Sequence, residues 1–205
     1  MTTSSMPPAG GEIGEPAIVA VPAFTLNHRP ASLRNYSRVV RTPTLIVVHC
    51  TDGHEGTTKD TDVAAMFQDP KLDPKRSAGY IVDANSVTHC VADQYVAFHC
   101  GHTGNLRGLG VELCGRASQT RAQWFDALSL PMLAIAARLC ADLCLEWSIP
   151  PRVVNARGLV AGEHGITTHS YVADAWHETK HHDPGPGFPL GKFVRAVAAA
   201  VELGR

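Results

Sequence analysis

The sequence has little net charge and no basic run. Its formal net charge is −1 over 205 residues, and only 18% of the residues are charged. A protein that binds nucleic acid needs Lys and Arg clustered on one face to neutralise phosphates, and no such cluster occurs here. We therefore expect no nucleic-acid partner.

The sequence also lacks a long uninterrupted apolar run. The most apolar stretch, residues 128–147, contains Pro131, Arg138 and Asp142, so it predicts an amphipathic helix and no membrane span. The first residues, MTTSSMPPAGGEIGEP, carry no basic start, and the AIVAVPAF that follows is too short and proline-broken for a secretory leader. We expect a protein without a signal peptide that is made in the cytoplasm.

No CxxC pair occurs among the six cysteines, which we interpret mainly as buried thiols. Cys140 and Cys144 lie four residues apart on one face of a predicted helix, and the other four lie in predicted strands. Together with His177 and His181 this pair resembles a zinc finger superficially. The gap between the two pairs is too long for that module.

The chain is predicted to form one α/β domain, in which helices flank a central mixed β-sheet. Residues 1–41 are rich in Pro, Gly, Ser and Thr and predict an N-terminal tail, which leaves 42–205 as the catalytic domain. Apolar runs and turn residues predict strands at 44–50, 79–83, 86–91, 108–115 and 152–160. Helical periodicity predicts helices at about 60–68, 120–147 and 190–203.

The chain has eleven histidines, which concentrate in a few places, as expected of a metal site. Zinc in hydrolases usually binds three His or carboxylate ligands and one water, whose pKa falls to about 7. His49 lies near the end of a predicted strand. Further along, His169 precedes Asp183, which opens the rigid Asp-Pro-Gly-Pro-Gly turn. Pro184 restricts the backbone of Asp183 and suits it to be a fixed loop ligand.

Five motifs resemble, in order and spacing, those of the type 2 N-acetylmuramoyl-L-alanine amidases. This family contains AmpD, phage amidase endolysins and animal peptidoglycan recognition proteins. The resemblance covers the chain from about Thr44 to Phe193. The motifs are LIVVHCT at 45–51, SAGYIVD at 77–83, AFHCG at 97–101, GLGVELCG at 108–115 and HHDPGPGFP at 181–189.

This resemblance implies that His49, His169 and Asp183 bind Zn²⁺. It also implies that Glu112, inside a predicted strand, is the base that activates the zinc-bound water. His181 occupies the position where many relatives carry a lysine thought to stabilise the oxyanion, which suggests the same role for its imidazole.

The resemblance further implies that Tyr80 and His99 line a groove for muramyl peptide. Several structural alternatives remain open at this point. Glu112 could be a buried ion-pair partner of Arg107 or Arg116, and His99 could be a structural hydrogen-bonding residue. His49 could likewise be an ordinary core histidine.

The expected function is a zinc-dependent amidase that cuts peptidoglycan between the lactyl group of N-acetylmuramic acid and L-alanine. The favoured setting is a phage endolysin that reaches the bacterial cell wall through a holin. The alternatives are a cytosolic amidase that recycles muropeptides, a non-catalytic peptidoglycan-binding module, and a regulatory zinc protein with no cell-wall ligand.

Overall fold

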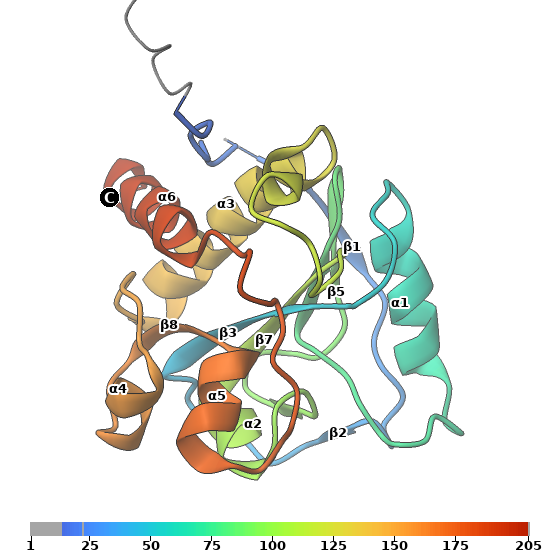
Figure 1. Ribbon diagram of the computed structural model, residues 1–205. Helices are drawn as coiled ribbons and strands as arrows, with labels where there is room; N and C mark the ends of the chain where they lie inside the picture. Colours follow the sequence, from blue (N-terminus) through green and yellow to red (C-terminus); the bar gives the residue numbers. More distant parts are fainter. Residues whose placement is uncertain (1–13, 22, 205) are drawn as a thin grey trace, which may run out of the picture.

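A six-stranded mixed sheet forms the centre of the molecule (Figure 1). The computed structural model describes residues 14–21 and 23–204. The strand order is β1-β5-β4-β7-β3-β8, and a small second sheet pairs β2 with β6. The strands are β1 Thr25–His28, β2 Tyr36–Ser37, β3 Leu45–Cys50, β4 Tyr80–Val82, β5 Ser86–His89, β6 Val96–Ala97, β7 Gly108–Leu113 and β8 Gly165–Thr168. This architecture confirms the predicted α/β fold.

Helices cover both faces of this sheet (Figure 1). They are α1 Lys59–Gln68, α2 His102–Arg107, α3 Ser129–Trp147, α4 Ala156–Val160, α5 His169–Trp176 and α6 Leu190–Leu203, with a short 3-10 turn at Gln123–Phe125. The apolar helices α3 and α6 pack side by side on one face, and α1 lies on the other side of the sheet. No helix in the described part of the chain is long and apolar enough to cross a membrane.

The direction of the strands brings several chain segments to one edge of the sheet. Strands β4, β7, β3 and β8 are neighbours and run parallel. Parallel strands end at the same edge, so the residues that follow each of them are close in space even when far apart in sequence. His49 and His169 lie at this edge, at the ends of β3 and β8.

The alternation of side chains along β7 explains how the sheet separates core from cavity. Leu109, Val111 and Leu113 point into the main apolar core beneath α3 and α6. Because successive side chains point to opposite faces, Gly108, Gly110 and Glu112 face the other side. On that face of β7, Glu112 is therefore the only one of these three residues with a side chain.

The N-terminal segment is more ordered than a trailing tail. Residues Thr25–His28 form β1, which pairs in parallel with β5 at the edge of the main sheet. Glu15 forms ion pairs with Arg121 (2.8 Å) and Lys192 (3.0 Å), which tie it to the region around α6. These residues of the predicted tail therefore pack against the domain, and residues 1–13 of it lie outside the described part.

The structure differs from the sequence prediction in two further ways, both in the segment before His169. The predicted strand at 152–160 is wrong, because Ala156–Val160 forms α4 and only Val153 makes a bridge, to Ile166. The last strand of the sheet is instead β8, which the sequence analysis missed. β8 has four residues, and its pairing comes from β3, more than a hundred positions away. A strand this short has no periodic signal of its own.

Candidate metal centre and cavity

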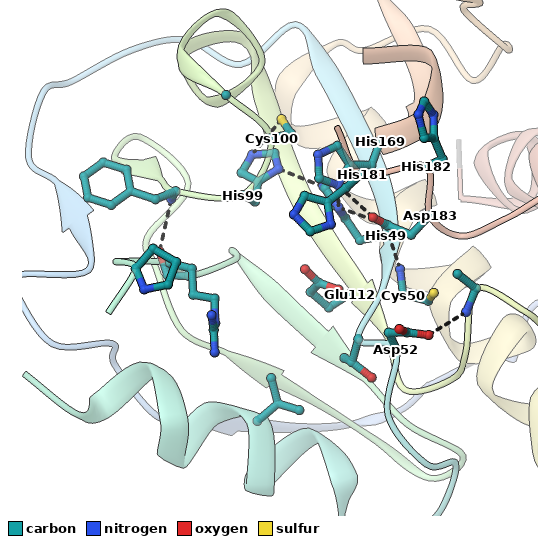
Figure 2. Close-up of a pocket in the computed structure, with 18 of the residues that line it drawn as sticks. His49, Cys50, Asp52, His99, Cys100, Glu112, His169, His181, His182 and Asp183 are labelled. Carbon is teal, nitrogen blue, oxygen red and sulfur yellow. Dashed lines mark hydrogen bonds and ion pairs between the residues drawn. The ribbon is translucent and has the colours of Figure 1, made fainter. Parts of the chain in front are cut away.

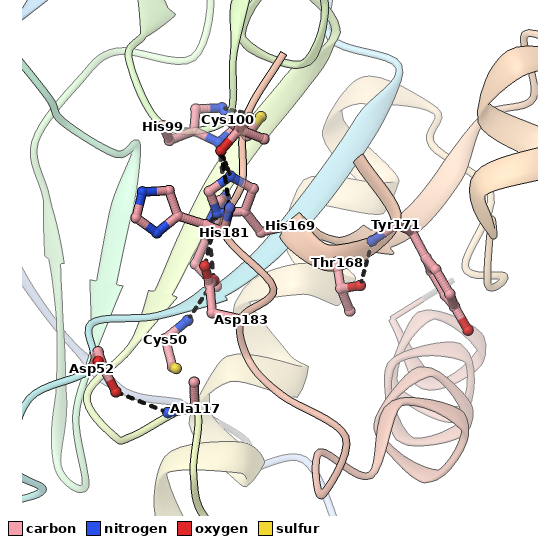
Figure 3. Close-up of polar contacts among 12 residues, drawn as sticks. Cys50, Asp52, His99, Cys100, Ala117, Thr168, His169, Tyr171, His181 and Asp183 are labelled. Atoms are coloured by element: carbon pink, nitrogen blue, oxygen red, sulfur yellow. Dashed lines mark hydrogen bonds and ion pairs between the residues drawn. The ribbon is translucent and has the colours of Figure 1, made fainter. Parts of the chain in front are cut away.

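The three predicted metal ligands come from separate segments that meet at the carboxyl edge of the sheet. His49 is the penultimate residue of β3, and His169 is the first residue of α5, directly after β8. The Thr168 hydroxyl accepts a hydrogen bond from the Tyr171 backbone N–H (3.3 Å) and caps α5 (Figure 3). This cap fixes the turn from which His169 points towards β3.

The ligating atoms of these residues converge on one point (Figure 2). His49 Nδ1 lies 3.1 Å from His169 Nδ1. The Asp183 carboxylate reaches both rings, with Oδ1 3.2 Å from His49 Nδ1 and Oδ2 2.8 Å from His169 Nδ1. One atom from each of the three residues lies within 4.8 Å of the others, which is close enough to hold one metal ion.

Backbone contacts hold the Asp183 carboxylate in place. The Cys50 N–H donates to Asp183 Oδ1 (3.1 Å), and the Asp183 carbonyl accepts from the Ser170 N–H (3.0 Å) (Figure 3). Burial alone raises the pKa of Asp183, but the His49 and His169 rings outweigh this effect and hold the pKa well below its ordinary value. The carboxylate is therefore charged at any physiological pH.

The far nitrogen of each histidine contacts a protein group. His49 Nε2 lies 2.9 Å from His99 Nδ1, and His99 Nε2 lies 3.2 Å from the Gly108 carbonyl oxygen. His169 Nε2 lies 3.1 Å from the Thr179 hydroxyl. Burial lowers the pKa of both His49 and His99 below the ordinary value of an imidazole.

These contacts assign the protons on the His49 and His99 rings. A carbonyl oxygen only accepts, so His99 Nε2–H donates to Gly108 and His99 Nδ1 is an acceptor. His49 must then donate from Nε2, which leaves the lone pair of its Nδ1 directed at Asp183. Two imidazole nitrogens and one carboxylate match the ligands of catalytic zinc sites, in which outer hydrogen bonds orient the metal-bound rings.

A second group of possible ligands, His49, His99 and Cys100, satisfies the same distance criterion. Both nitrogens of His99 are already used, however, by His49 and Gly108. Burial also raises the pKa of the Cys100 thiol well above its ordinary value, which disfavours the thiolate that a metal needs. The group around Asp183 is therefore the better metal site.

A cavity of about 840 Å³ opens over the three ligands. Its walls come from α1, the segment at 74–77, the AFHCG turn and the loops at 117–118 and 181–186. Gly185 is essential to the last of these loops, because its φ is 85° and a Cβ there would overlap the Ala117 carbonyl. The DPGPG turn therefore packs directly against the loop at Ala117.

Glu112 lies on the floor of this cavity, paired in register with His49 on the neighbouring strand. Its Oε2 is buried and has no hydrogen-bond partner among the described residues. Burial, with a smaller contribution from the charge on Asp183, raises the pKa of Glu112 to about 8. The glutamate is thus held in an environment that favours its protonated form.

The ion-pair alternative for Glu112 is wrong. Arg107 donates to the carbonyl oxygens of Leu159 (3.2 Å) and Glu163 (2.9 Å). Arg116 lies 3.1 Å from the His54 ring. In the described part of the chain, neither arginine pairs with Glu112.

The remaining predicted site residues differ in position. His181 is exposed at the cavity, where its ring stacks on His169 with a centroid distance of 5.4 Å. His99 borders the cavity, but its Nδ1 contacts the predicted ligand His49, as the hydrogen-bonding alternative expects. Tyr80 lies in register with Val111 and therefore points to the α3 side of the sheet.

The predicted contact of Tyr80 with substrate needs correction. Its hydroxyl donates to Asp93 Oδ1 (2.8 Å), and Asp93 Oδ2 accepts from Trp147 Nε1 (2.9 Å). These partners place the Tyr80 side chain away from the cavity. The motif suggested proximity to the metal, but the alternation along β4 decides which face the side chain takes.

Several residues in or beside the site have no signal in the sequence that the motifs capture. Asp52 borders the cavity with a positive φ of 53°, and its Oδ1 accepts from the Ala117 N–H (3.2 Å) (Figure 3). Thr179 contacts His169, although nothing in the surrounding sequence marks it. The alternate glycines at 108 and 110, on the same strand face as Glu112, are a signal that could have indicated a group packed on that face.

Comparison with known proteins identifies the family. The model of the N-acetylmuramoyl-L-alanine amidase family (Amidase_2) matches residues 39–186. The chain therefore belongs to the N-acetylmuramoyl-L-alanine amidase family. None of the curated proteins matches the chain.

Solved structures share the fold at low sequence identity. The hydrolase AmiA of Staphylococcus aureus has a TM-score of 0.68 at 17% identity, covering 91% of this chain and 87% of AmiA. A mutant endolysin from Bacillus subtilis has a TM-score of 0.62 at 18% identity, with coverage of 87% and 99%. An AmpD derivative has a TM-score of 0.56 at 20% identity, with coverage of 84% and 93%.

Proposed function

We propose that this protein is a zinc-dependent amidase that hydrolyses the bond between the lactyl group of N-acetylmuramic acid and L-alanine in peptidoglycan. The observation that carries the proposal is the convergence of His49 Nδ1, His169 Nδ1 and the Asp183 carboxylate beneath an open cavity. Membership of the amidase family supplies the reaction. The same three residues, all present, argue against a binding module that has lost its metal.

His49, His169 and Asp183 would hold the zinc ion. When bound, the ion would supply a Lewis acid for the amide carbonyl and lower the pKa of a water molecule. The protein's own part is to present two imidazole nitrogens and one carboxylate in a fixed arrangement. The contacts of His99, Thr179 and the Cys50 N–H serve this purpose.

Glu112 is the proposed proton carrier. Hydrolysis needs one group that takes a proton from the attacking water and gives a proton to the alanine nitrogen when the C–N bond breaks. A carboxyl with a pKa of about 8 changes protonation state near neutral pH. Its position across from His49 in the sheet places it on the floor of the same cavity.

His181 is the proposed donor to the oxyanion. Its ring is exposed at the cavity and stacked on His169, which leaves its nitrogens open to a substrate bound there. A well-placed donor of this kind contributes about 2.7–4 kcal/mol to the transition state. His181→Ala should therefore lower kcat by about 10² or more while leaving zinc content unchanged.

The proposal is tested by digesting purified sacculi and analysing the products by mass spectrometry. We expect free stem peptides that begin with L-alanine, together with intact glycan strands. A chelator should abolish the release and added zinc should restore it. His169→Ala and Asp183→Ala should lose both zinc and activity, whereas His164→Ala, which changes an exposed histidine directly before β8, should keep both. Unchanged hydrolysis by the zinc-free protein would refute the proposal.

For the biological setting we propose an endolysin that acts on the intact cell wall. The likeness to an endolysin over 99% of that chain supports this setting; AmiA shares the fold with a higher TM-score (0.68) and AmpD with a lower one (0.56). The experiment compares intact sacculi with soluble muropeptides as substrates. An endolysin should cleave sacculi efficiently, and a clear preference for the soluble fragments would favour the recycling amidase.

A further inference from the structure

Two hydrogen bonds link His49 through His99 to the backbone of β7, and together they use both ring nitrogens of His99. Its Nδ1 accepts from His49 Nε2–H, and its Nε2–H donates to the Gly108 carbonyl. Nothing on the ring remains to bind a substrate. Asn105 of α2 also fixes the backbone at this turn, because its side-chain oxygen accepts from the His99 N–H (2.9 Å).

The neighbouring strand is shaped to receive this ring. A Cβ at Gly110 would lie 2.9 Å from His99 Cγ and 3.0 Å from His99 Nδ1, which is closer than real Cβ contacts. At Gly108 a Cβ would lie 3.4 Å from His99 Cε1 and would also overlap Val47. Glycine at position 110 leaves room for the imidazole to lie against β7, with both nitrogens directed at their partners.

We propose that His99 is a positioning residue that fixes the tautomer and orientation of His49, and thereby sets the affinity of the metal centre. This inference rests on the proposed zinc-dependent function. With Nε2–H held by His99, the Nδ1 lone pair of His49 is permanently available to the metal. Without this partner, His49 can place its proton on Nδ1, where Asp183 Oδ1 lies 3.2 Å away, and the metal must then displace that proton.

The first experiment measures zinc affinity by competition with a chromophoric chelator. Loss of an outer-shell partner typically weakens metal binding by about 10- to 100-fold, and we expect this for His99→Leu. His99→Gln should recover part of the loss, because an amide can accept from His49 and donate to Gly108. Gly110→Ala should weaken binding as well, because it displaces the His99 ring without changing its chemistry.

His89 offers a matched control. It is also a partly buried histidine beside the sheet, and its Nε2 donates to the Val91 carbonyl (3.0 Å). Its ring stacks on Tyr80, away from the cavity. His89→Leu should therefore bind zinc as tightly as the wild type. Thermal unfolding of each variant in chelator checks that the chain is folded.

The second experiment reads the tautomer of His49 directly. Long-range ¹H–¹⁵N spectra of the zinc-free protein should show the Nε2–H form of His49 in the wild type and in His89→Leu. In His99→Leu the spectra should show a mixture with the Nδ1–H form. A purely structural role for His99 would not change this signal.

The outcomes separate this inference from the proposed function. If the wild type binds zinc tightly and His99→Leu binds it equally tightly, the inference is overturned and the function stands. If the wild type binds no zinc, the proposed function fails and the inference fails with it. A weaker His99→Leu, partly restored by His99→Gln and not matched by His89→Leu, establishes the positioning role.

Discussion

The buried carboxyl of Glu112 makes a prediction about stability that is independent of activity. In the zinc-free protein its pKa is raised from 4.5 to about 8, chiefly by burial. The folded state therefore holds a proton that the unfolded state releases between these two pH values. Stability due to this group is complete below the unfolded pKa and is lost as the pH rises towards 8.

The size of the effect follows from the two pKa values. One pKa unit corresponds to about 1.4 kcal/mol, and most of the window between 4.5 and about 8 lies between pH 5 and pH 8. Wild-type protein should thus lose roughly 3 kcal/mol from Glu112 over this range. Because the residue is partly open to the cavity, this figure is an upper value, and we expect a loss of about 1–3 kcal/mol.

Glu112→Gln removes the titration while keeping the shape of the side chain. The assay is urea unfolding of both proteins in chelator at pH 5 and pH 8. The difference in unfolding free energy between variant and wild type cancels the other titrating groups, and it should grow in favour of Glu112→Gln as the pH rises. The same variant should lose amidase activity when zinc is present. A difference that stays constant with pH would refute the reasoning, because it would mean that the carboxyl is solvated or paired.

Three further outcomes follow from the geometry. Gly185→Ala should destabilise the fold by about 1–3 kcal/mol and weaken zinc binding, since a Cβ at this positive φ meets the Ala117 carbonyl and displaces the turn that begins at Asp183. Urea unfolding measures the loss of stability and chelator competition measures the zinc affinity. Unchanged zinc affinity would contradict the proposed dependence of the metal site on this turn. Tyr80→Phe should cost about 1 kcal/mol through loss of the hydrogen bond to Asp93 and leave kcat/KM unchanged, whereas a large drop in kcat would restore Tyr80 as a cavity residue. All six cysteines are buried with free thiols, so a thiol reagent should label none of them in the native protein and all of them in urea; rapid labelling of the native protein would show that a thiol is accessible.

Much of the fold could be predicted because its signals are local. The apolar run at β3, the turn between β4 and β5 and the periodicity of α6 are each contained within a short stretch of sequence. The edge strands β1 and β8 could not be predicted in this way. Their residues become strands because β5 and β3 offer free hydrogen-bonding groups, and that pairing exists only in the folded chain.

Local sequence patterns are enough to identify the residue types available for chemistry: the histidines, the rigid turn after Asp183 and a glutamate inside an apolar strand. What these groups can do depends on the folded chain. Parallel strands brought His49 and His169 together, and side-chain alternation turned Tyr80 away from the cavity. The absence of a side chain at Gly110 lets His99 lie against β7 beside His49. Contacts of this kind depend on which strands become neighbours, and this is set by packing of the whole sheet and not by any local motif.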